Sequence, residues 1–334
     1  MFAHMPIIRD ILYGAAQYGA SLPALCRELK ISSTDLNRSD IVADFKTAYT
    51  TWEVAVKATG DPTLGLRLGA ITTPSILGIV GHVMQNCRTL HEAFSRVCAF
   101  SAVATDMFKY ALTDKGEQTV LTFSPAHAWI RVSPATARQA SDQAMRGCLN
   151  VFFLLSGRRL QPVSAAFTCN KPSQLERYTQ SFGCPLRFGA KSNALIFQRA
   201  DLQHPLNQYD QSLLTTFEAL ARKQLHKRQA KRSFADEVVQ CMRYEFAARV
   251  PSLEVMAAHM NISVRTFQRK LSAERKNYRD IADQVSKEIA LSLLASGKTR
   301  VSDVSHLMGY SEPSAFRRAF RRWTKSTPRK ARPE

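Results

Sequence analysis

The sequence contains no apolar run long enough to cross a membrane. The longest such run, near Leu149–Leu155, is far shorter than the roughly 20 residues that a membrane-spanning helix needs. The first residues, MFAHMPIIRD, also lack the charged, apolar and small-residue segments of a signal peptide. We therefore expect a cytoplasmic protein that does not bind a membrane.

Cysteines are scattered rather than paired. The chain has seven, an odd number, and none stands in a CxxC spacing. Such a set argues against a zinc site and a disulfide framework, and it is typical of a reducing compartment. We expect buried free thiols and no metal site, with a redox-sensing cysteine as the alternative. The seven are Cys26, Cys87, Cys98, Cys148, Cys169, Cys184 and Cys241.

The motifs of common enzymes are missing as well. There is no GxSxG, HExxH or Walker A sequence, and the eight histidines are dispersed. His82, His91 and His127 do not have the spacing of metal ligands. A DNA-repair methyltransferase would need a metal-bound reactive cysteine cluster, which the cysteine spacings do not offer. We therefore expect no catalytic residues, no cofactor and no enzymatic activity.

Acidic residues are scarce in the last third of the chain. The whole sequence has a formal net charge of +19. Residues 221–334 hold 25 Lys and Arg against 11 Asp and Glu, so this third carries +14 of that excess. A basic segment attached to a nearly neutral remainder is typical of a nucleic-acid-binding module. A basic surface kept for solubility is the alternative interpretation.

Two stretches in this basic third repeat one pattern, a helix, a tight turn and a second helix. The turn needs a left-handed residue, which glycine adopts freely and asparagine more readily than most residues. A small residue one turn earlier lets the two helices cross closely, and a serine after the turn is placed to cap the second helix. These positions are filled by Ala257, Asn261 and Ser263, and by Ser305, Gly309 and Ser311.

The second helix of each stretch has one apolar and one polar face. Phe267 and Leu271 recur at i and i+4 in the first, as do Phe316 and Phe320 in the second, so we expect these side chains to face the core. Polar and basic side chains are left on the opposite face. Pro313 lies in the first turn of the second helix, where its missing N–H costs nothing.

Between the two stretches the apolar residues again have helical spacing. Tyr278, Ile281, Val285, Ile289 and Leu293 predict one long helix, and a glycine at position 297 is placed to end it. About 18 residues at roughly 1.5 Å each give on the order of 27 Å. That approaches the roughly 34 Å between successive major-groove faces of B-DNA. One helix is therefore long enough to hold two reading heads on one side of a duplex.

On these residues, Phe234–Thr327 resembles the DNA-binding domain of the AraC/XylS transcription regulators. The most specific motif is SEPSAFRRAFRRW…TP, from Ser311 to Pro328. The sequence departs from the family pattern at Ser286, where an arginine is usual, and at Lys325, where a glycine is usual. The resemblance implies a sequence-specific DNA-binding regulator, with activation as the usual output.

The first two hundred residues mix helical and strand patterns. Helical spacing dominates residues 6–69 and 75–108, and the segment 108–125 alternates around Asp114, Lys115 and Gly116 as a hairpin does. Residues 134–155 read as a helix, and three later segments, 163–170, 184–190 and 194–202, read as strands. We expect an α+β N-terminal domain plus an all-α C-terminal domain with two helix-turn-helix units joined by a long linker helix.

This N-terminal pattern resembles the arabinose-binding-like domain of many AraC-type regulators rather than a cupin barrel. The resemblance rests on three motifs that together span about Met5 to Leu206. They are Trp52 with GDPTLGLRLG, the SILGIVGH…TLHEAF run and the late PVSAAFTC…LIF…DLQHPL stretch. The predicted domains are residues 1–210 for effector binding and dimerisation, 211–233 for a helix and basic linker, and 234–334 for DNA binding.

Recognition helices present their N-terminal side chains to base edges in the major groove. The candidates for base contact are Arg265, Gln268, Arg269, Ser314, Arg317 and Arg318. Other residues are better placed to bind phosphate, which sets register without reading sequence. These are Ser263, Thr266, Ser311, Arg321 and Arg322. For each base-contact candidate, a phosphate contact or a surface charge is the alternative.

Two residues of the N-terminal part are candidates for the effector site. Trp129 and Arg131 lie in a segment expected to be a loop, where they could hold an anionic or apolar molecule, although simple packing explains them too. The resemblance implies a small-molecule or fatty-acid-like effector, a homodimer, double-stranded promoter DNA and RNA polymerase as partners. The rival hypothesis is an effector-independent architectural DNA-binding protein whose N-terminal domain only dimerises.

Overall fold

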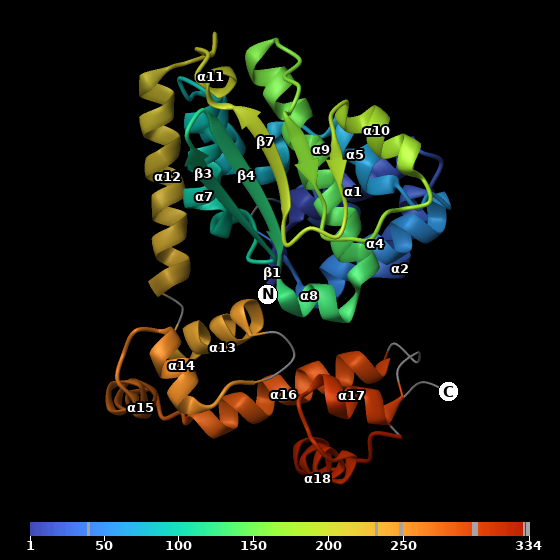
Figure 1. The fold of residues 1–334 in the computed structure, drawn as a ribbon, viewed down its shortest axis with the longest axis vertical. Helices are drawn as coiled ribbons and strands as arrows, with labels where there is room; N and C mark the ends of the chain where they lie inside the picture. The colour runs from blue at the N-terminus through green and yellow to red at the C-terminus, as the bar shows by residue number, and fades with distance from the viewer. Residues whose placement is uncertain (39–40, 231–232, 247–249, 296–299, 330, 332–334) are drawn as a thin grey trace. The chain divides into compact units, whose positions relative to one another are not determined.

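The computed structural model describes residues 1–38, 41–230, 233–246, 250–295, 300–329 and 331 (Figure 1). Contacts divide the chain into two compact units. The N-terminal unit comprises Met1–Pro125 and Ala135–Arg228, and the C-terminal unit comprises Ala126–Pro134 and Gln229–Glu334. Within the described residues, no helix combines the length and the apolar character that a membrane span requires.

The N-terminal unit begins with helices, as the spacing of its apolar residues predicts. Their ends carry local signals: Asp44 caps one helix by accepting a hydrogen bond from the Thr47 N–H at 2.8 Å, and Gly60 ends it with a φ of 62°. Two short antiparallel strands, β1 (Phe2–His4) and β2 (Val42–Asp44), had no sequence signal. The helices are α1 (Met5–Gln17), α2 (Leu22–Leu29), α3 (Ser33–Leu36), α4 (Phe45–Thr59), α5 (Leu64–Ile71), η1 (Pro74–Leu77), α6 (Ile79–Gln85) and α7 (Leu90–Ala104).

A five-stranded sheet in the order β3-β4-β7-β5-β6 follows. The predicted hairpin is present, with Gly116 at a φ of 59° in its turn. All neighbouring strands are antiparallel except β5 and β6, which are parallel. The strands are β3 (Phe108–Lys115), β4 (Gln118–Pro125), β5 (Ser164–Ala166), β6 (Leu186–Arg187) and β7 (Asn193–Gln198). The helices beside them are α9 (Pro134–Ser156), α10 (Leu175–Phe182), α11 (Arg199–Leu202) and α12 (Gln211–Ala230).

Aromatic side chains join this sheet to two helices. Phe94 of α7 lies with its ring centroid 5.7 Å from that of Phe123 on β4, and Phe152 of α9 lies 5.7 Å from Phe197 on β7. All four side chains are buried. Burying a side chain of this size contributes roughly 1.5–3 kcal/mol, so the cluster is a main source of cohesion in the unit.

The glycines of the GDPTLGLRLG motif permit a close helix contact. A Cβ on Gly65 would lie 2.1 Å from the carbonyl oxygen of Gln139 on α9, and one on Gly69 would lie 2.7 Å from the Arg146 Cβ. Gln139 fastens the contact, because its Oε1 accepts a hydrogen bond from the Gly65 N–H at 2.6 Å and its Nε2 donates to the Pro62 carbonyl. Only glycine fits between α5 and α9 at these positions.

One predicted loop is in fact helical. Residues His127–Val132, which contain both effector candidates, form the short helix α8. Its N–H groups of Trp129 and Ile130 bond to the carbonyl of Ala126, which begins the helix. With only six residues, the segment is too short for its apolar spacing to distinguish a helical turn from a loop.

The C-terminal unit continues with helices that surround two small cores. Phe267, Ile281 and Val285 belong to the first core, whereas Ala290, Leu294 and Phe316 belong to the second. The helices are α13 (Phe234–Glu245), α14 (Leu253–His259), α15 (Val264–Ala273), α16 (Tyr278–Ala295), α17 (Val301–Leu307) and α18 (Pro313–Thr324). The glycine expected to end α16 lies outside the described residues. The predicted class, an α+β N-terminal region and a helical C-terminal region, is confirmed.

We predict that Gly65→Ala lowers the free energy of unfolding by about 2–3 kcal/mol, because the added methyl group must push α5 away from α9. Gly116→Ala is the control: no atom lies within 4 Å of its new Cβ, and only the left-handed backbone costs about 1 kcal/mol. Urea unfolding followed by circular dichroism measures both. A Gly65→Ala loss no larger than that of Gly116→Ala would contradict the close contact.

Candidate nucleic-acid interface

The first helix pair, α14 and α15, has the local structure that its sequence predicts. Asn261 lies in the turn with a φ of 54°, the left-handed conformation. Ser263 then caps α15, its Oγ accepting from the Thr266 N–H at 3.2 Å. Ala257, one turn before Asn261, is 1% exposed and belongs to the core between the helices.

The second pair, α17 and α18, differs from the first at its cap. Gly309 has a φ of 85° and Ser305 is fully buried, as the repeat predicts. The expected cap at Ser311 is wrong, because Glu312 is the N-cap of α18 and Pro313 is its first residue. The second turn is one residue longer than the first, so Glu312 rather than Ser311 stands where Ser263 stands in the first pair.

On α15 and α18 the apolar face is buried and the polar face is open. Phe267, Leu271, Phe316 and Phe320 are each at most 1% exposed. All six base-contact candidates are exposed, and none of their side chains makes a hydrogen bond or ion pair within the described part of the chain. The six are Arg265, Gln268 and Arg269 on α15, and Ser314, Arg317 and Arg318 on α18.

The exposed residues form one continuous stripe on each helix. On α18, Ser314, Arg317, Arg318 and Arg321 are spaced at i, i+3, i+4 and i+7, which places them on the face opposite Phe316 and Phe320. Three of these four residues are arginines, so the face carries a strong positive charge over two helical turns. A stripe of this kind fits an anionic, elongated partner such as the backbone of a nucleic acid.

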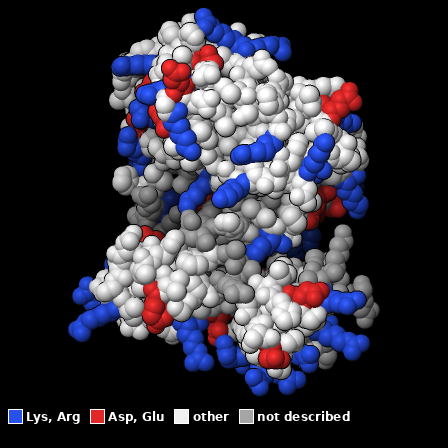
Figure 2. Space-filling model, in the orientation of Figure 1, with Lys and Arg blue, Asp and Glu red and all other residues white. Residues whose placement is uncertain are grey.

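The two basic helices both lie at the edge of the C-terminal unit. In Figure 1 each is seen nearly along its axis, α15 to the left of α16 and α18 below it. Figure 2 shows Lys and Arg side chains gathered along the edge of the unit where these two helices lie. With 18 residues, α16 spans about 27 Å between the helix pairs.

An acidic residue of α16 holds the end of α18. The Asp283 carboxylate accepts from the Arg322 Nη2 at 2.7 Å and from the indole Nε1–H of Trp323 at 2.8 Å. Arg322 is therefore engaged with α16, although its side chain is 51% exposed and keeps donors for a phosphate. Sequence reasoning missed Asp283, because one acidic residue on a long helix carries no signal that a distant helix lies against it.

A second carboxylate stabilises the N-terminus of α13. Glu274, which follows α15, accepts from the backbone N–H groups of Phe234 and Ala235 at 2.5 and 2.9 Å. These donors lie at the N-terminus of α13, where N–H groups have no partner within the helix and a negative charge is favourable. The Phe234 ring also lies 5.1 Å from that of Phe267. The first residue of α13 is thus fastened directly to the first basic helix.

The two departures from the family pattern also have a structural setting. Lys325 ends α18 in the left-handed conformation, with a φ of 57°, so it occupies a backbone position that glycine would adopt without strain. Ser286 is buried and lines a hollow of about 170 Å³ with Val250, Met308 and Tyr310. Ser286 is buried, so it is not part of either exposed stripe.

The effector candidates are not an open pair of ligand contacts. Trp129 is 4% exposed, and burial lowers the pKa of Arg131 to about 10. The three guanidinium nitrogens of Arg131 are buried without a hydrogen-bond partner in the described part of the chain. Neither residue lines the hollow of about 460 Å³ beside α12 or the hollow of about 170 Å³ at Ser286.

Comparison with known proteins matches both parts of the chain. Residues 19–206 match the family described as the arabinose-binding domain of AraC transcription regulators, N-terminal, and residues 256–334 match a helix-turn-helix domain. The ornithine utilization regulator of Pseudomonas aeruginosa is 25% identical over 319 residues, covering 94% of this chain and 91% of that protein. VirS of Mycobacterium tuberculosis, a helix-turn-helix transcriptional regulator, is 25% identical over 81% of this chain and 78% of its own.

Two further matches concern a part of the chain and a solved structure. The regulator VqsM of Pseudomonas aeruginosa is 43% identical over 74 residues, which are 22% of this chain and 23% of that protein. The crystal structure of the transcriptional regulator CdpR from the same organism aligns with 92% of this chain and 95% of its own, with 21% identity and a TM-score of 0.45.

We predict that Asp283→Ala weakens DNA contact by α18 about tenfold and leaves contact by α15 unchanged. The substitution removes the acceptor of Trp323 and Arg322, and a buried donor left unpaired costs about 1–3 kcal/mol. Asp280→Ala on the same helix is the control, because Asp280 accepts from Asn277 and not from α18. Hydroxyl-radical footprinting of both halves of a bound duplex measures the difference; equal loss at both halves would contradict it.

Proposed function

Because this chain belongs to the AraC family of transcription regulators, we propose that it binds promoter DNA sequence-specifically under the control of a small-molecule or lipid effector held by its N-terminal domain. The observation that carries the proposal is the pair of exposed, basic helix faces on α15 and α18, each backed by its own core. Activation is the expected output, through contact with RNA polymerase.

The proposed division of labour follows the two kinds of domain. Residues 1–210 bind the effector and form a homodimer, 211–233 connect, and 234–334 bind DNA. The helix α12 occupies most of the connecting segment, since it continues to Ala230. One relative over most of the chain is named for ornithine utilization, which supports control by a small metabolite. The protein acts in the cytoplasm, where promoter DNA is accessible.

The proposed roles of the exposed residues follow their positions on the helices. Arginine can hold guanine O6 and N7 with two hydrogen bonds, and glutamine suits adenine. We assign base reading to Arg265, Gln268, Arg269, Ser314, Arg317 and Arg318. Phosphate binding falls to Ser263, Thr266, Ser311, Arg321 and Arg322, with Arg322 using the donors that Asp283 leaves open.

We predict that Arg269→Ala and Arg318→Ala each relax base preference in one half of the site, by about 1–3 kcal/mol for a lost two-bond contact. Arg187→Ala, which removes an exposed arginine of β6, is the control for charge. Gel shifts with a set of single-base substitutions measure the change, starting from a site selected out of random DNA. Uniform weakening at every position would show that these arginines bind phosphate only.

We also predict that effector binding raises the melting temperature of the full-length protein in a screen of metabolites and fatty acids. A ligand at 100 times its Kd stabilises the folded state by about 2.7 kcal/mol. DNA affinity measured with the same compound should then change. An architectural protein without an effector would bind DNA specifically yet respond to none of the compounds, and this outcome would favour the rival hypothesis.

A further inference from the structure

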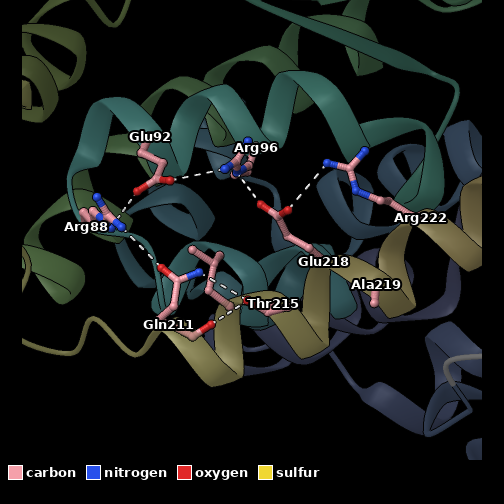
Figure 3. Close-up of a pocket in the computed structure, with 9 residues that line it drawn as sticks. Arg88, Glu92, Arg96, Gln211, Thr215, Glu218, Ala219 and Arg222 are labelled. Carbon is pink, nitrogen blue, oxygen red and sulfur yellow. Dashed lines mark hydrogen bonds and ion pairs between the residues drawn. The ribbon is translucent and has the colours of Figure 1, made fainter.

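A polar groove of about 460 Å³ lies along α12 within the N-terminal unit (Figure 3). Arg88, Glu92 and Arg96 line it at the start of α7 and along that helix, and α12 contributes Gln211, Glu218 and Arg222. Its volume is within the range of small-molecule sites, but its lining is far more charged than that of most apolar pockets. An occupant would therefore be recognised by charge and hydrogen bonding.

Each oxygen of the two carboxylates in the groove already lies close to a cationic or N–H group. Glu92 accepts from the Arg88 backbone N–H at 2.8 Å with one oxygen, and its other oxygen lies 3.2 Å from the Arg96 Nη2. Glu218 reaches the Arg96 Nε at 2.5 Å with one oxygen and the Arg222 Nη2 at 3.5 Å with the other. Few acceptor sites remain for a cationic ligand, so the groove is poorly suited to an amine.

Donors, in contrast, are in excess at the two ends of the groove. A guanidinium group has five N–H donors. Arg88 donates to Gln211 Oε1 at 3.3 Å and bonds the Tyr209 side chain, and Arg222 makes one long ion pair to Glu218 and lies 5.4 Å from the Phe100 ring centroid. The Arg222 side chain is 61% exposed. Two underused guanidinium groups in one groove favour an anionic ligand.

The positions of these arginines suggest two separated anionic groups. Arg88 contacts Gln211 at the start of α12, and Arg222 follows Gln211 by 11 residues, a rise of about 16 Å along the helix. A single phosphate or sulfate ion could meet one end only. Between the two ends, the carboxylates of Glu92 and Glu218 lie against the guanidinium of Arg96, so a carboxylate fits beside an arginine in this groove.

We propose that the groove between α7 and α12 is the effector site and that it binds an elongated dicarboxylate, with one carboxylate against Arg88 and the other against Arg222. This inference rests on the proposed function, which requires an effector in the N-terminal domain. A carboxylate at Arg222 competes with Glu218, the one acidic residue of α12. Ligand binding therefore changes how α12 is held, and α12 leads along the chain into the DNA-binding residues.

The test uses the full-length protein and thermal unfolding at constant ionic strength. The probes are suberate, azelate and sebacate, whose carboxylates are far enough apart to reach both arginines, compared with neutral suberamide, the diamine octane-1,8-diamine, and sulfate as a simple anion. At least one dicarboxylate should raise the melting temperature by about 5 °C at 100 times its Kd. The diamide and the diamine should have no effect.

Substitutions place the binding in the groove. Arg88→Gln and Arg222→Gln should each weaken the dicarboxylate about tenfold, as expected for the loss of a charge-assisted hydrogen bond. Both side chains are exposed, so the variants should fold. Lys223→Gln is the matched control, since it removes a neighbouring exposed charge of α12 that does not line the groove.

The outcomes separate this inference from the proposed function. Stabilisation by no dicarboxylate, equal stabilisation by sulfate, or unchanged affinity in Arg88→Gln and Arg222→Gln would each overturn the dicarboxylate site. If the same protein still binds its selected DNA and responds to another class of compound, the proposed function stands without this site. If it binds no DNA sequence specifically, the proposed function itself fails.

Discussion

The DNA-binding part depends on one constraint. In each helix pair, the second helix follows a left-handed turn and buries one of its faces. Phe267 and Leu271 fill the first core, and Phe316 and Phe320 fill the second, so the opposite faces of α15 and α18 must point outward. A helix repeats every 3.6 residues, and the arginines stand on the remaining positions. The spacing that places the apolar side chains in the cores therefore also places the arginines on the exposed faces.

Because α16 packs into both cores, its length sets the distance between the two helix pairs. The first half of α16 packs into one core through Ile281 and Val285, and its second half packs into the other through Ala290 and Leu294. A continuous helix resists stretching, so the spacing of the two pairs depends on its length. Asp283 adds an orientation, because it lies in the half of α16 that belongs to the first core yet holds the end of α18.

Local patterns explain which features could be predicted. Asn261, Gly309 and the Ser263 cap depend on neighbouring residues alone, and all three have the expected conformation. The prediction of a cap at Ser311 was wrong because the second turn is one residue longer than the first, which makes Glu312 the N-cap of α18. Asp283 and the groove could not be found, because each joins segments distant in sequence. Gly65 and Gly69 were visible as a motif, but their cause, the close approach of α9, required the structure.

The attachment of α12 shows how a modest ligand could control a regulator. Among the described residues of this helix, Leu214 and Ala221 are the buried apolar contacts, while Leu213 and Leu220 are nearly half exposed. Exposed ion pairs such as that of Glu218 with Arg222 contribute only about 0–1 kcal/mol each. Coupling between sites in regulatory proteins is typically about 1–3 kcal/mol. A ligand that exchanges one or two of these contacts therefore acts on the scale that regulation requires, whereas loosening the aromatic core of the same unit would cost far more.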